Sequence, residues 1–109
     1  MATIEDFQRV EMRVGVIVEV AELPEARKPS FRLTIDFGPL GRRQSVAALK
    51  TDYRAEELMN RQVVCAFNLP PRRIAGVKSE VLVLAATHDD GTLRLLGPEP
   101  AAELGSLIT

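Results

Sequence analysis

The sequence predicts a single, mostly β domain whose strands close into a small barrel. The chain has 109 residues, of which 46% are hydrophobic and 27% charged, a composition typical of globular proteins. Two separate cores would leave each half close to the size at which burial barely offsets chain entropy, so we expect residues 1–109 to form one domain. Apolar and polar residues alternate over 10–20 and again over 31–37, which is the pattern of strands with one buried face.

The N-terminus carries the signals of a short helix. Thr3 is a good N-cap, and acidic residues at positions 5 and 6 are favourable in a first helical turn. A helix of about one or two turns here would bury Ile4, Phe7 and Val10.

Three strands that could form a meander are expected next. In the first, valine or methionine occupies every even position from 10 to 20, and Gly15 marks a point where a coiled strand can bend as the barrel closes. A loop with two prolines separates it from the second strand, 31–37, whose apolar residues take the odd positions. A turn leads to a third strand of mixed character over 42–48.

The second half predicts a connecting helix and further strands. Thr51 or Asp52 can cap a helix that ends before Asn60, and 62–67 is apolar and β-branched, as in a strand. We expect 68–78 to be irregular.

The last third of the chain predicts a hairpin. In the segment 80–86 every residue after Glu80 is apolar, which is consistent with a strand buried on both faces. The sequence Asp89-Asp90-Gly91 predicts a tight turn into a strand over 92–96. The order of elements fits an all-β dominated fold, a five-stranded Greek-key β-barrel of the OB type with short N-terminal and connecting helices.

The residues that enzymes use for catalysis are few and lack partners along the chain. His88, the only histidine, lies in the predicted turn, and Cys65, the only cysteine, lies mid-strand, where it behaves as a small hydrophobe. No base flanks Ser45 or Ser79. One cysteine and one histidine provide neither a zinc-ligand set nor an intramolecular disulfide. We therefore expect no catalytic residue, no metal and no cofactor.

The sequence predicts a cytoplasmic protein. The acidic N-terminus lacks the basic and apolar regions of a signal peptide. No apolar run approaches the ~20 residues of a membrane span, so we expect no membrane insertion. A single cysteine suits a reducing compartment.

Charge is distributed unevenly along the chain. The net charge is -1, but residues 26–78 carry 11 basic and 4 acidic side chains, a local net charge of +7, between two acidic ends. Basic residues that cluster in space would form a surface that attracts anions. Basic residues scattered over loops would only solvate the surface, and the sequence leaves both interpretations open.

The segment 68–79 combines a stiff backbone with cations. Pro70 and Pro71 restrict the chain before Arg72 and Arg73, so the two guanidinium groups lose little freedom when an anion binds. Arginine forks suit phosphate or carboxylate groups. Three further polar residues of this segment are Asn68, Lys78 and Ser79.

Several motifs along the chain carry a resemblance to a known family. The Asn-Leu-x-Pro-Arg segment at 68–72, the following Gly-Val and then Ser79 resemble the tRNA-binding OB-fold family, found appended to some methionyl- and phenylalanyl-tRNA synthetases and in free-standing dimers. Within that family the sequence is more similar to the CsaA-type export-related chaperones. The motifs that support this are Val14-Gly15-x-Ile17-Val18, Pro24-Glu25-Ala26-Arg27-x-Pro29, Ile35-Asp36-Phe37-Gly38, Gln44-Ser45 and Pro70-Pro71-Arg72-Arg73-Ile74-Ala75-Gly76.

The resemblance implies a homodimer that holds unfolded or precursor polypeptides before export, with affinity for tRNA in the wider family. Many tRNA-binding relatives have a His-Pro-x-Ala loop and a lysine before the Pro-Arg pair. This chain has Leu23-Pro24 and Pro70 instead, which implies fewer phosphate contacts. We expect the N-terminal helix and residues 93–108 to contribute to the dimer contact.

Three functions stay open on the sequence: a chaperone for polypeptides, a tRNA-binding module and a purely structural dimer. For RNA we expect recognition by shape and backbone charge, because most of the five aromatic residues belong in the core. The candidate ligand contacts are Arg27, Lys28, Arg42, Arg43, Ser45, Asn68, Arg72, Arg73, Lys78 and Ser79. The candidates for an apolar pocket floor are Phe31, Val46, Leu49 and Ile74, although an ordinary core position is the favoured interpretation for each of them.

Overall fold

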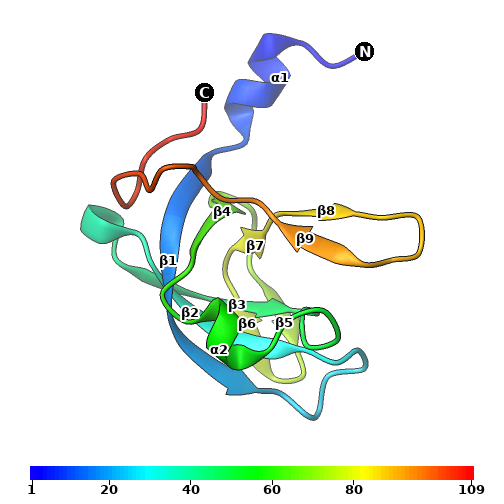
Figure 1. Cartoon of the computed structure of the whole chain (residues 1–109). Helices are drawn as coiled ribbons and strands as arrows, with labels where there is room; N and C mark the ends of the chain where they lie inside the picture. The colour runs from blue at the N-terminus through cyan, green and yellow to red at the C-terminus, as the bar shows by residue number, and fades with distance from the viewer.

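The computed structural model describes residues 1–109, and at its centre a five-stranded antiparallel sheet curls into a barrel (Figure 1). The strand order in this sheet is β3-β2-β1-β4-β7. The five strands are β1 (Met12–Glu22), β2 (Phe31–Asp36), β3 (Arg42–Ala47), β4 (Gln62–Ala66) and β7 (Leu82–Val83). This order, with a helix between β3 and β4, confirms the predicted barrel of the OB type.

The remaining elements are short and surround the barrel. They are α1 (Ile4–Arg9), the 3-10 helix η1 (Gly38–Leu40), α2 (Ala55–Leu58), the hairpin of β5 (Arg72–Ile74) and β6 (Val77–Ser79), and the hairpin of β8 (Ala85–Thr87) and β9 (Leu93–Leu95). Helix α1 stands above the barrel and the β8-β9 hairpin projects to one side of it (Figure 1). No helix is both long and apolar enough to cross a membrane.

Side chains complete the closure of the barrel between β3 and the chain leading into β7. The Ser45 hydroxyl donates to the Val81 carbonyl at 2.7 Å. The backbone N–H of Val46 donates to the Ser79 hydroxyl oxygen at 3.0 Å. Both serines are buried, so each hydroxyl supplies a hydrogen bond that a regular strand ladder would otherwise have made. We call this line of contact between β3 and residues 79–81, just before β7, the seam.

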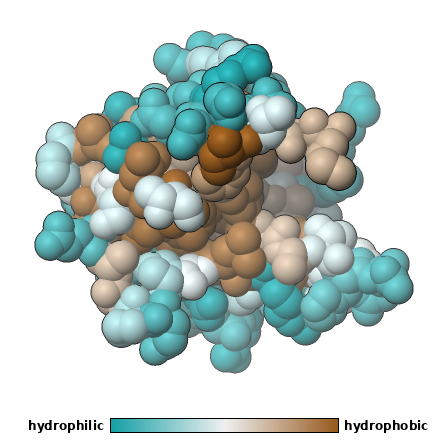
Figure 2. All heavy atoms as spheres, turned by 90° about the horizontal axis from the view of Figure 1, so that it is seen from above, coloured by the Kyte–Doolittle hydropathy of each residue, from teal (hydrophilic) through white to brown (hydrophobic).

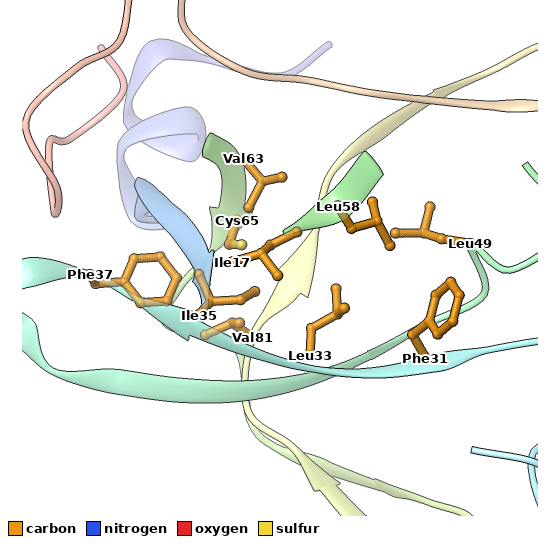
Figure 3. Close-up of a cluster of buried hydrophobic side chains, with 10 residues drawn as sticks. All are labelled: Ile17, Phe31, Leu33, Ile35, Phe37, Leu49, Leu58, Val63, Cys65 and Val81. Atoms are coloured by element: carbon orange, nitrogen blue, oxygen red, sulfur yellow. The ribbon is translucent and has the colours of Figure 1, made fainter. Parts of the chain in front are cut away.

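Ten buried apolar side chains fill the interior of the barrel (Figure 3). Four of them, Phe31, Leu33, Ile35 and Phe37, follow the odd positions of the second predicted strand, and their burial confirms that prediction. Leu58 of α2 is fully buried and belongs to the same cluster. Each side chain of this size stabilises the fold by about 1.5–3 kcal/mol on burial.

The predicted inward face of β1 is wrong over most of the strand. Gly15 and Ile17 face the core, and the even-numbered positions face outward. A register shift directly after Ile17 inserts an extra residue and restores even positions to the inside, so that Val20 packs against the core. Val14 is buried on the outer face, where its backbone hydrogen bonds to residues 105 and 106 of the C-terminal segment.

The connecting helix is shorter than predicted and starts later. Neither Thr51 nor Asp52 caps it, because α2 begins after Arg54. The Asp52 carboxylate instead accepts a hydrogen bond from the Leu93 N–H at 3.1 Å. The expected cap is therefore a tertiary contact to the β8-β9 hairpin.

Two further predictions for the second half are wrong. Residues 68–78, expected to be irregular, include β5 and part of β6. The run 80–86 is not one strand buried on both faces, because Leu82 is 44% exposed. Leu84 divides the run: its N–H donates to Val64 of β4, while its carbonyl accepts from Leu96 beyond β9. The chain thus changes pairing partner at Leu84.

Helix α1 forms where predicted but leaves its apolar side chains outside the core. Thr3 makes the expected cap, with its hydroxyl accepting from the Asp6 N–H at 3.2 Å. Ile4 is 64% exposed and Phe7 and Val10 are each 37% exposed. The expectation that these residues are buried is wrong within one chain, because α1 stands clear of the barrel (Figure 1).

The packing around Gly15 gives a first testable prediction. A Cβ atom at this position would lie 2.5 Å from Ile35 Cγ2 and 2.8 Å from Phe37 Cε1, far inside van der Waals contact. We expect Gly15→Ala to lower the free energy of unfolding by about 1–3 kcal/mol, the usual cost of overpacking a core. Chemical denaturation measures the change. Val16→Ile, which adds a methylene at a half-buried, outward-facing position of the same strand, is the control, and equal stability of the two variants would contradict the prediction.

Candidate binding surface

The side chains that could act in catalysis do not meet partners. Cys65 is buried in the core, and this burial raises the pKa of its thiol to about 12, so the thiol is neutral near pH 7. His88 is exposed in the turn of the β8-β9 hairpin. In the same turn, the Asp90 carboxylate accepts hydrogen bonds from the hydroxyl and the N–H of Thr92, which agrees with the turn role predicted for it. No three His, Cys, Asp or Glu side chains lie where they could together hold a metal ion.

The β5-β6 hairpin holds two arginines in a defined frame. Ala75 and Gly76 form its turn with φ angles of +50° and +81°, and two consecutive positive φ angles are the mark of a type I′ turn. Arg72 pairs with Ser79 and Arg73 pairs with Lys78 across the hairpin. Because Ser79 is tied to β3 (see above), the hairpin is anchored to the barrel seam.

A cavity of about 690 Å³ lies beside this hairpin, where the seam is open. Eleven of its 17 lining residues are hydrophobic, so its floor is apolar. The loop between β1 and β2 contributes Glu25, Ala26, Arg27, Lys28 and Ser30; β3 and the following residues contribute Val46, Ala47, Ala48 and Leu49; the β5-β6 hairpin contributes Arg72, Arg73, Ile74 and Ala75; the last strands contribute Leu82, Val83, Ala85 and Leu93.

Four cations border this cavity and none has an acidic partner. Arg27 and Lys28 come from the loop between β1 and β2, and Arg72 and Arg73 come from β5. The protein has five ion pairs, and these four residues take part in none of them. Glu25 is the one acidic residue of the lining. The rim therefore carries a net positive charge that attracts anions.

The other predicted basic residues lie elsewhere. Arg43 places its guanidinium 5.0 Å from the centre of the Phe67 ring and donates to the Leu40 carbonyl at 3.0 Å, an arrangement that stabilises the protein itself. Arg42 and Lys78 are exposed and do not line the cavity.

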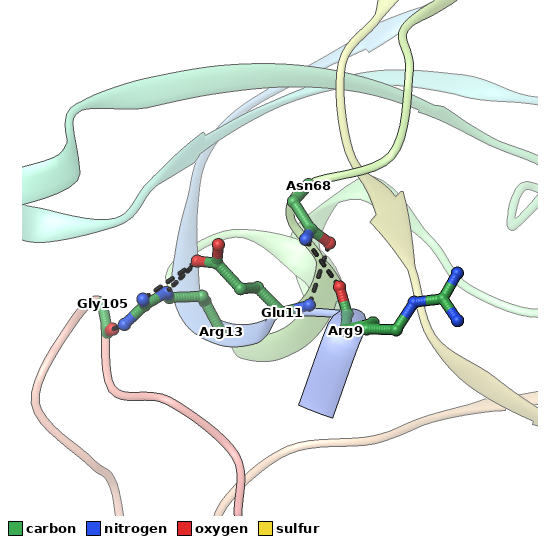
Figure 4. Close-up of polar contacts among 5 residues, drawn as sticks. All are labelled: Arg9, Glu11, Arg13, Asn68 and Gly105. Carbon is green, nitrogen blue, oxygen red and sulfur yellow. Dashed lines mark hydrogen bonds and ion pairs between the residues drawn. The ribbon is translucent and has the colours of Figure 1, made fainter. Parts of the chain in front are cut away.

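The predicted polar contacts have partners within the protein. Ser45 and Ser79 make the seam bonds described above. The Asn68 side chain accepts from the Glu11 N–H at 2.8 Å and donates to the Arg9 carbonyl at 2.9 Å (Figure 4). Asn68 thus fixes the base of α1. Arg13 strengthens the same region by donating to the Gly105 carbonyl at 3.0 Å.

The predicted apolar floor divides between core and cavity. Val46, Leu49 and Ile74 line the cavity, whereas Phe31 belongs to the core cluster and does not line it. Val83, Ala85 and Leu93 complete the floor and were not predicted, because the sequence suggests a buried strand over 80–86 and gives no sign that its pairing partner changes. A second cavity of about 530 Å³ adjoins the first and shares Arg72 and Leu82 with it.

An apolar face surrounds the two termini. Seen from the side that bears α1, hydrophobic residues gather at the centre of the surface and hydrophilic residues ring them (Figure 2). Ile4, Phe7 and Val10 of this region are exposed, and Leu107 near the C-terminus is 49% exposed. Positions three apart in a helix share one side, so Ile4 and Phe7 present a common apolar stripe.

The fold agrees with the comparisons to known proteins. The chain matches the family described as "Putative tRNA binding domain" over residues 12–107, and it therefore belongs to the tRNA-binding domain family. Over its full length it is similar to CsaA chaperones. It is 42% identical to the CsaA chaperone protein of Picrophilus torridus, with a TM-score of 0.93 and 100% of each chain covered. It is 43% identical to the chaperone CsaA of Bacillus anthracis, with a TM-score of 0.94 and 100% and 99% covered.

Similar sequences also occur as parts of longer proteins. The methionine–tRNA ligase of Porphyromonas gingivalis is 39% identical over 104 residues, which are 95% of this chain and 15% of the ligase. The corresponding enzyme of Sorangium cellulosum is 41% identical over 106 residues, again 15% of its length. The chain thus spans about 15% of the length of these ligases.

Burial of Cys65 predicts a specific dependence of stability on pH. The folded thiol has a pKa of about 12, whereas an unfolded cysteine ionises near pH 8.5. Deprotonation therefore favours the unfolded chain above that pH, and the stabilisation present at lower pH is lost as pH rises toward 12. Between those values we expect the free energy of unfolding to fall by up to about 1.4 kcal/mol per pH unit from this group.

The difference in denaturation between the unmodified protein and Cys65→Ala, measured from pH 8 to pH 11, isolates this contribution from other titrating groups. Parallel curves for the two proteins would contradict the prediction.

Proposed function

We propose that the protein is a non-enzymatic chaperone of the CsaA type, which holds unfolded or presecretory polypeptides in the cytoplasm before their export. The observation that carries this proposal is the 690 Å³ cavity, with its apolar floor and its rim of four cations that lack acidic partners. Full-length similarity to two CsaA chaperones supports the same function.

The floor and the rim suit different parts of an unfolded chain. Val46 and Ile74 are half-buried, so their side chains retain surface that a ligand can cover. Each square ångström of apolar surface removed from water stabilises the complex by about 25 cal/mol, before the cost of ordering the ligand. The cations accelerate the capture of segments that carry carboxylates and contribute less to final affinity.

Binding of tRNA is a second candidate function. It is supported by membership of the tRNA-binding domain family and by similarity to domains of methionine–tRNA ligases. Phe31 and Phe37 lie in the core, and Phe67 is covered by Arg43. With few rings free to stack on bases, recognition of RNA would depend on phosphate contacts and shape.

We also propose that the protein is a homodimer joined through the apolar face around its termini. Ile4, Phe7 and Leu107 are exposed there, and monomeric proteins rarely leave large apolar patches uncovered. A second copy placed on α1 would cover them. The predicted contribution of the N-terminal helix and the C-terminal stretch to the dimer belongs to this proposal.

Replacing both cavity arginines tests the chaperone and tRNA proposals together. We expect Arg72→Ala/Arg73→Ala to weaken binding of an unfolded presecretory polypeptide at least about tenfold, because each charge-assisted hydrogen bond contributes about 1.5–3 kcal/mol. For tRNA, we expect the slope of log affinity against log salt to become shallower by about one to two units. Fluorescence anisotropy measures both affinities.

The matched control is Arg42→Ala/Arg94→Ala, which removes the same charge at exposed positions outside the cavity. Unchanged tRNA affinity in the cavity variant would contradict RNA binding at this rim. Failure of the unmodified protein to delay aggregation of an unfolded client at equimolar dimer would contradict the chaperone function.

Sedimentation equilibrium tests the homodimer. We expect twice the chain mass of 12.0 kDa for the unmodified protein and the single-chain mass for Ile4→Asp/Phe7→Asp, because buried unpaired charges oppose association. Met59→Asp is the control, since Met59 is 40% exposed and lies at the end of α2, outside the proposed contact. A monomeric mass for the unmodified protein would contradict the proposal.

A further inference from the structure

The two outer edges of the β8-β9 hairpin differ in their hydrogen bonding. On β9, the N–H of Leu93 donates to the Asp52 carboxylate at 3.1 Å, and the N–H of Leu95 donates to the Tyr53 hydroxyl oxygen at 3.0 Å. These side chains occupy the donors that an additional strand would need, which is one way proteins block a sheet edge. No strand pairs with the opposite edge, formed by β7 and β8.

The alternation of hydrogen bonds identifies the free backbone groups of this edge. The Leu84 N–H donates to the Val64 carbonyl in β4, and the Leu84 carbonyl accepts from the Leu96 N–H on the other arm of the hairpin. The His88 N–H donates to the Thr92 carbonyl on that same arm. In an antiparallel ladder, residues bonded to the partner alternate with residues whose N–H and C=O point the other way. Val83, Ala85 and Thr87 therefore direct their peptide groups away from β4 and β9.

The cationic cavity lies against this free edge. Leu82 and Val83 both line it, although successive side chains of a strand point to opposite faces. Because β4 occupies one edge of β7, a cavity that touches both residues must meet β7 at its other edge. Ala85 lines the same cavity and Thr87 lines an adjacent one of about 590 Å³. The open edge is about 17 Å long, enough for roughly five paired residues.

We propose that the cavity takes its polypeptide ligand as an added β-strand on the edge of β7 and β8, and that the preferred segment alternates apolar and acidic residues. This inference rests on the proposed chaperone function and specifies its ligand. Peptide groups that alternate along the edge match another peptide backbone, whereas a sugar-phosphate chain has no such repeat, so a polypeptide is favoured over RNA. The side chains on one face of the added strand would contact the apolar floor, and those on its other face would contact the cations of the rim.

A backbone-methylation scan of a synthetic peptide tests the binding mode. The probe is a seven-residue peptide of alternating valine and glutamate with acetylated and amidated ends, and calorimetry gives its affinity. A strand donates every second N–H to its neighbour. We therefore expect methylation of alternate peptide nitrogens to weaken binding about tenfold or more, while methylation of the intervening ones has little effect. Lysine in place of glutamate should also weaken binding about tenfold or more.

A second measurement reports from the protein side. We expect the amide protons of Ala85 and Thr87 to exchange with solvent at least about tenfold more slowly when the peptide is bound, because a bound strand protects them. Ala85→Pro removes one free donor without removing a bond to β9, and we expect it to weaken the peptide about tenfold.

The failures of the two proposals are distinguishable. Equal tolerance of methylation at every position, with binding still lost in Arg72→Ala/Arg73→Ala, would overturn the added strand and leave the chaperone function in place. Retention of unfolded clients without binding of the alternating peptide would also overturn the added strand. If the unmodified protein binds neither unfolded clients nor the peptide, the chaperone function itself is contradicted.

Discussion

The incomplete closure of the barrel is the constraint on which the rest of the structure depends. Where β3 meets the chain before β7, the hydroxyls of Ser45 and Ser79 complete the contact with backbone groups 36 and 33 residues away in sequence, respectively. Beyond Val46 the two sides separate, because the chain leaves β4 at Leu84 and pairs within its own hairpin. The separation of β3 from the chain after Leu84 ends the closure of the barrel and also opens the cavity. The extent of the seam and the shape of the site therefore have the same structural origin.

The cavity holds together two features that usually separate at a protein surface. Its apolar floor continues from the core, since Leu49 belongs to both the core cluster and the cavity lining. Its rim brings four cations together with one carboxylate, that of Glu25. The cations remain hydrated and screened by salt, so their mutual repulsion costs little. A ligand that covers the floor also reduces this repulsion if it carries carboxylates, which makes mixed apolar and acidic segments better ligands than purely apolar ones.

Sequence patterns predicted the elements that strict alternation determines and failed where a single backbone event changes the pattern. Residues 31–37 keep period two without interruption, and their buried face was predicted in full. In β1, one register shift after Ile17 reverses which side faces the core, and nothing in the residue types announces it. The β5-β6 hairpin was missed because its turn places Ala75, rather than asparagine or glycine, at a positive φ.

The sequence predicted the charges of the candidate site in part, since Arg42, Arg43 and Lys78 lie outside the cavity, and it did not predict the hydrogen bonds. Arg27, Lys28, Arg72 and Arg73 were predicted as ligand contacts, and the fold brings them to one cavity. Ser45 was predicted in the same set, yet its hydroxyl donates to a carbonyl 36 residues away. The residue type determines which hydrogen bonds a polar side chain can make. The fold determines whether the partner in those bonds is a ligand or another group of the protein.

Asn68 connects the apolar face at the termini with the cationic cavity. Its side chain bonds to the backbone on both sides of the junction between α1 and β1 (Figure 4). From Asn68 the chain passes through Pro70 and Pro71 into the arginines of β5, and the two prolines leave this connection little freedom to bend. A partner that packs on α1 therefore acts on a helix whose base is bonded to the start of the segment that carries half of the cationic rim. The proposed dimer contact and the proposed polypeptide site are thus connected through the Asn68 amide and the short, stiff loop that follows it. The position of one relative to the other is therefore fixed within each single chain and does not depend on dimerisation.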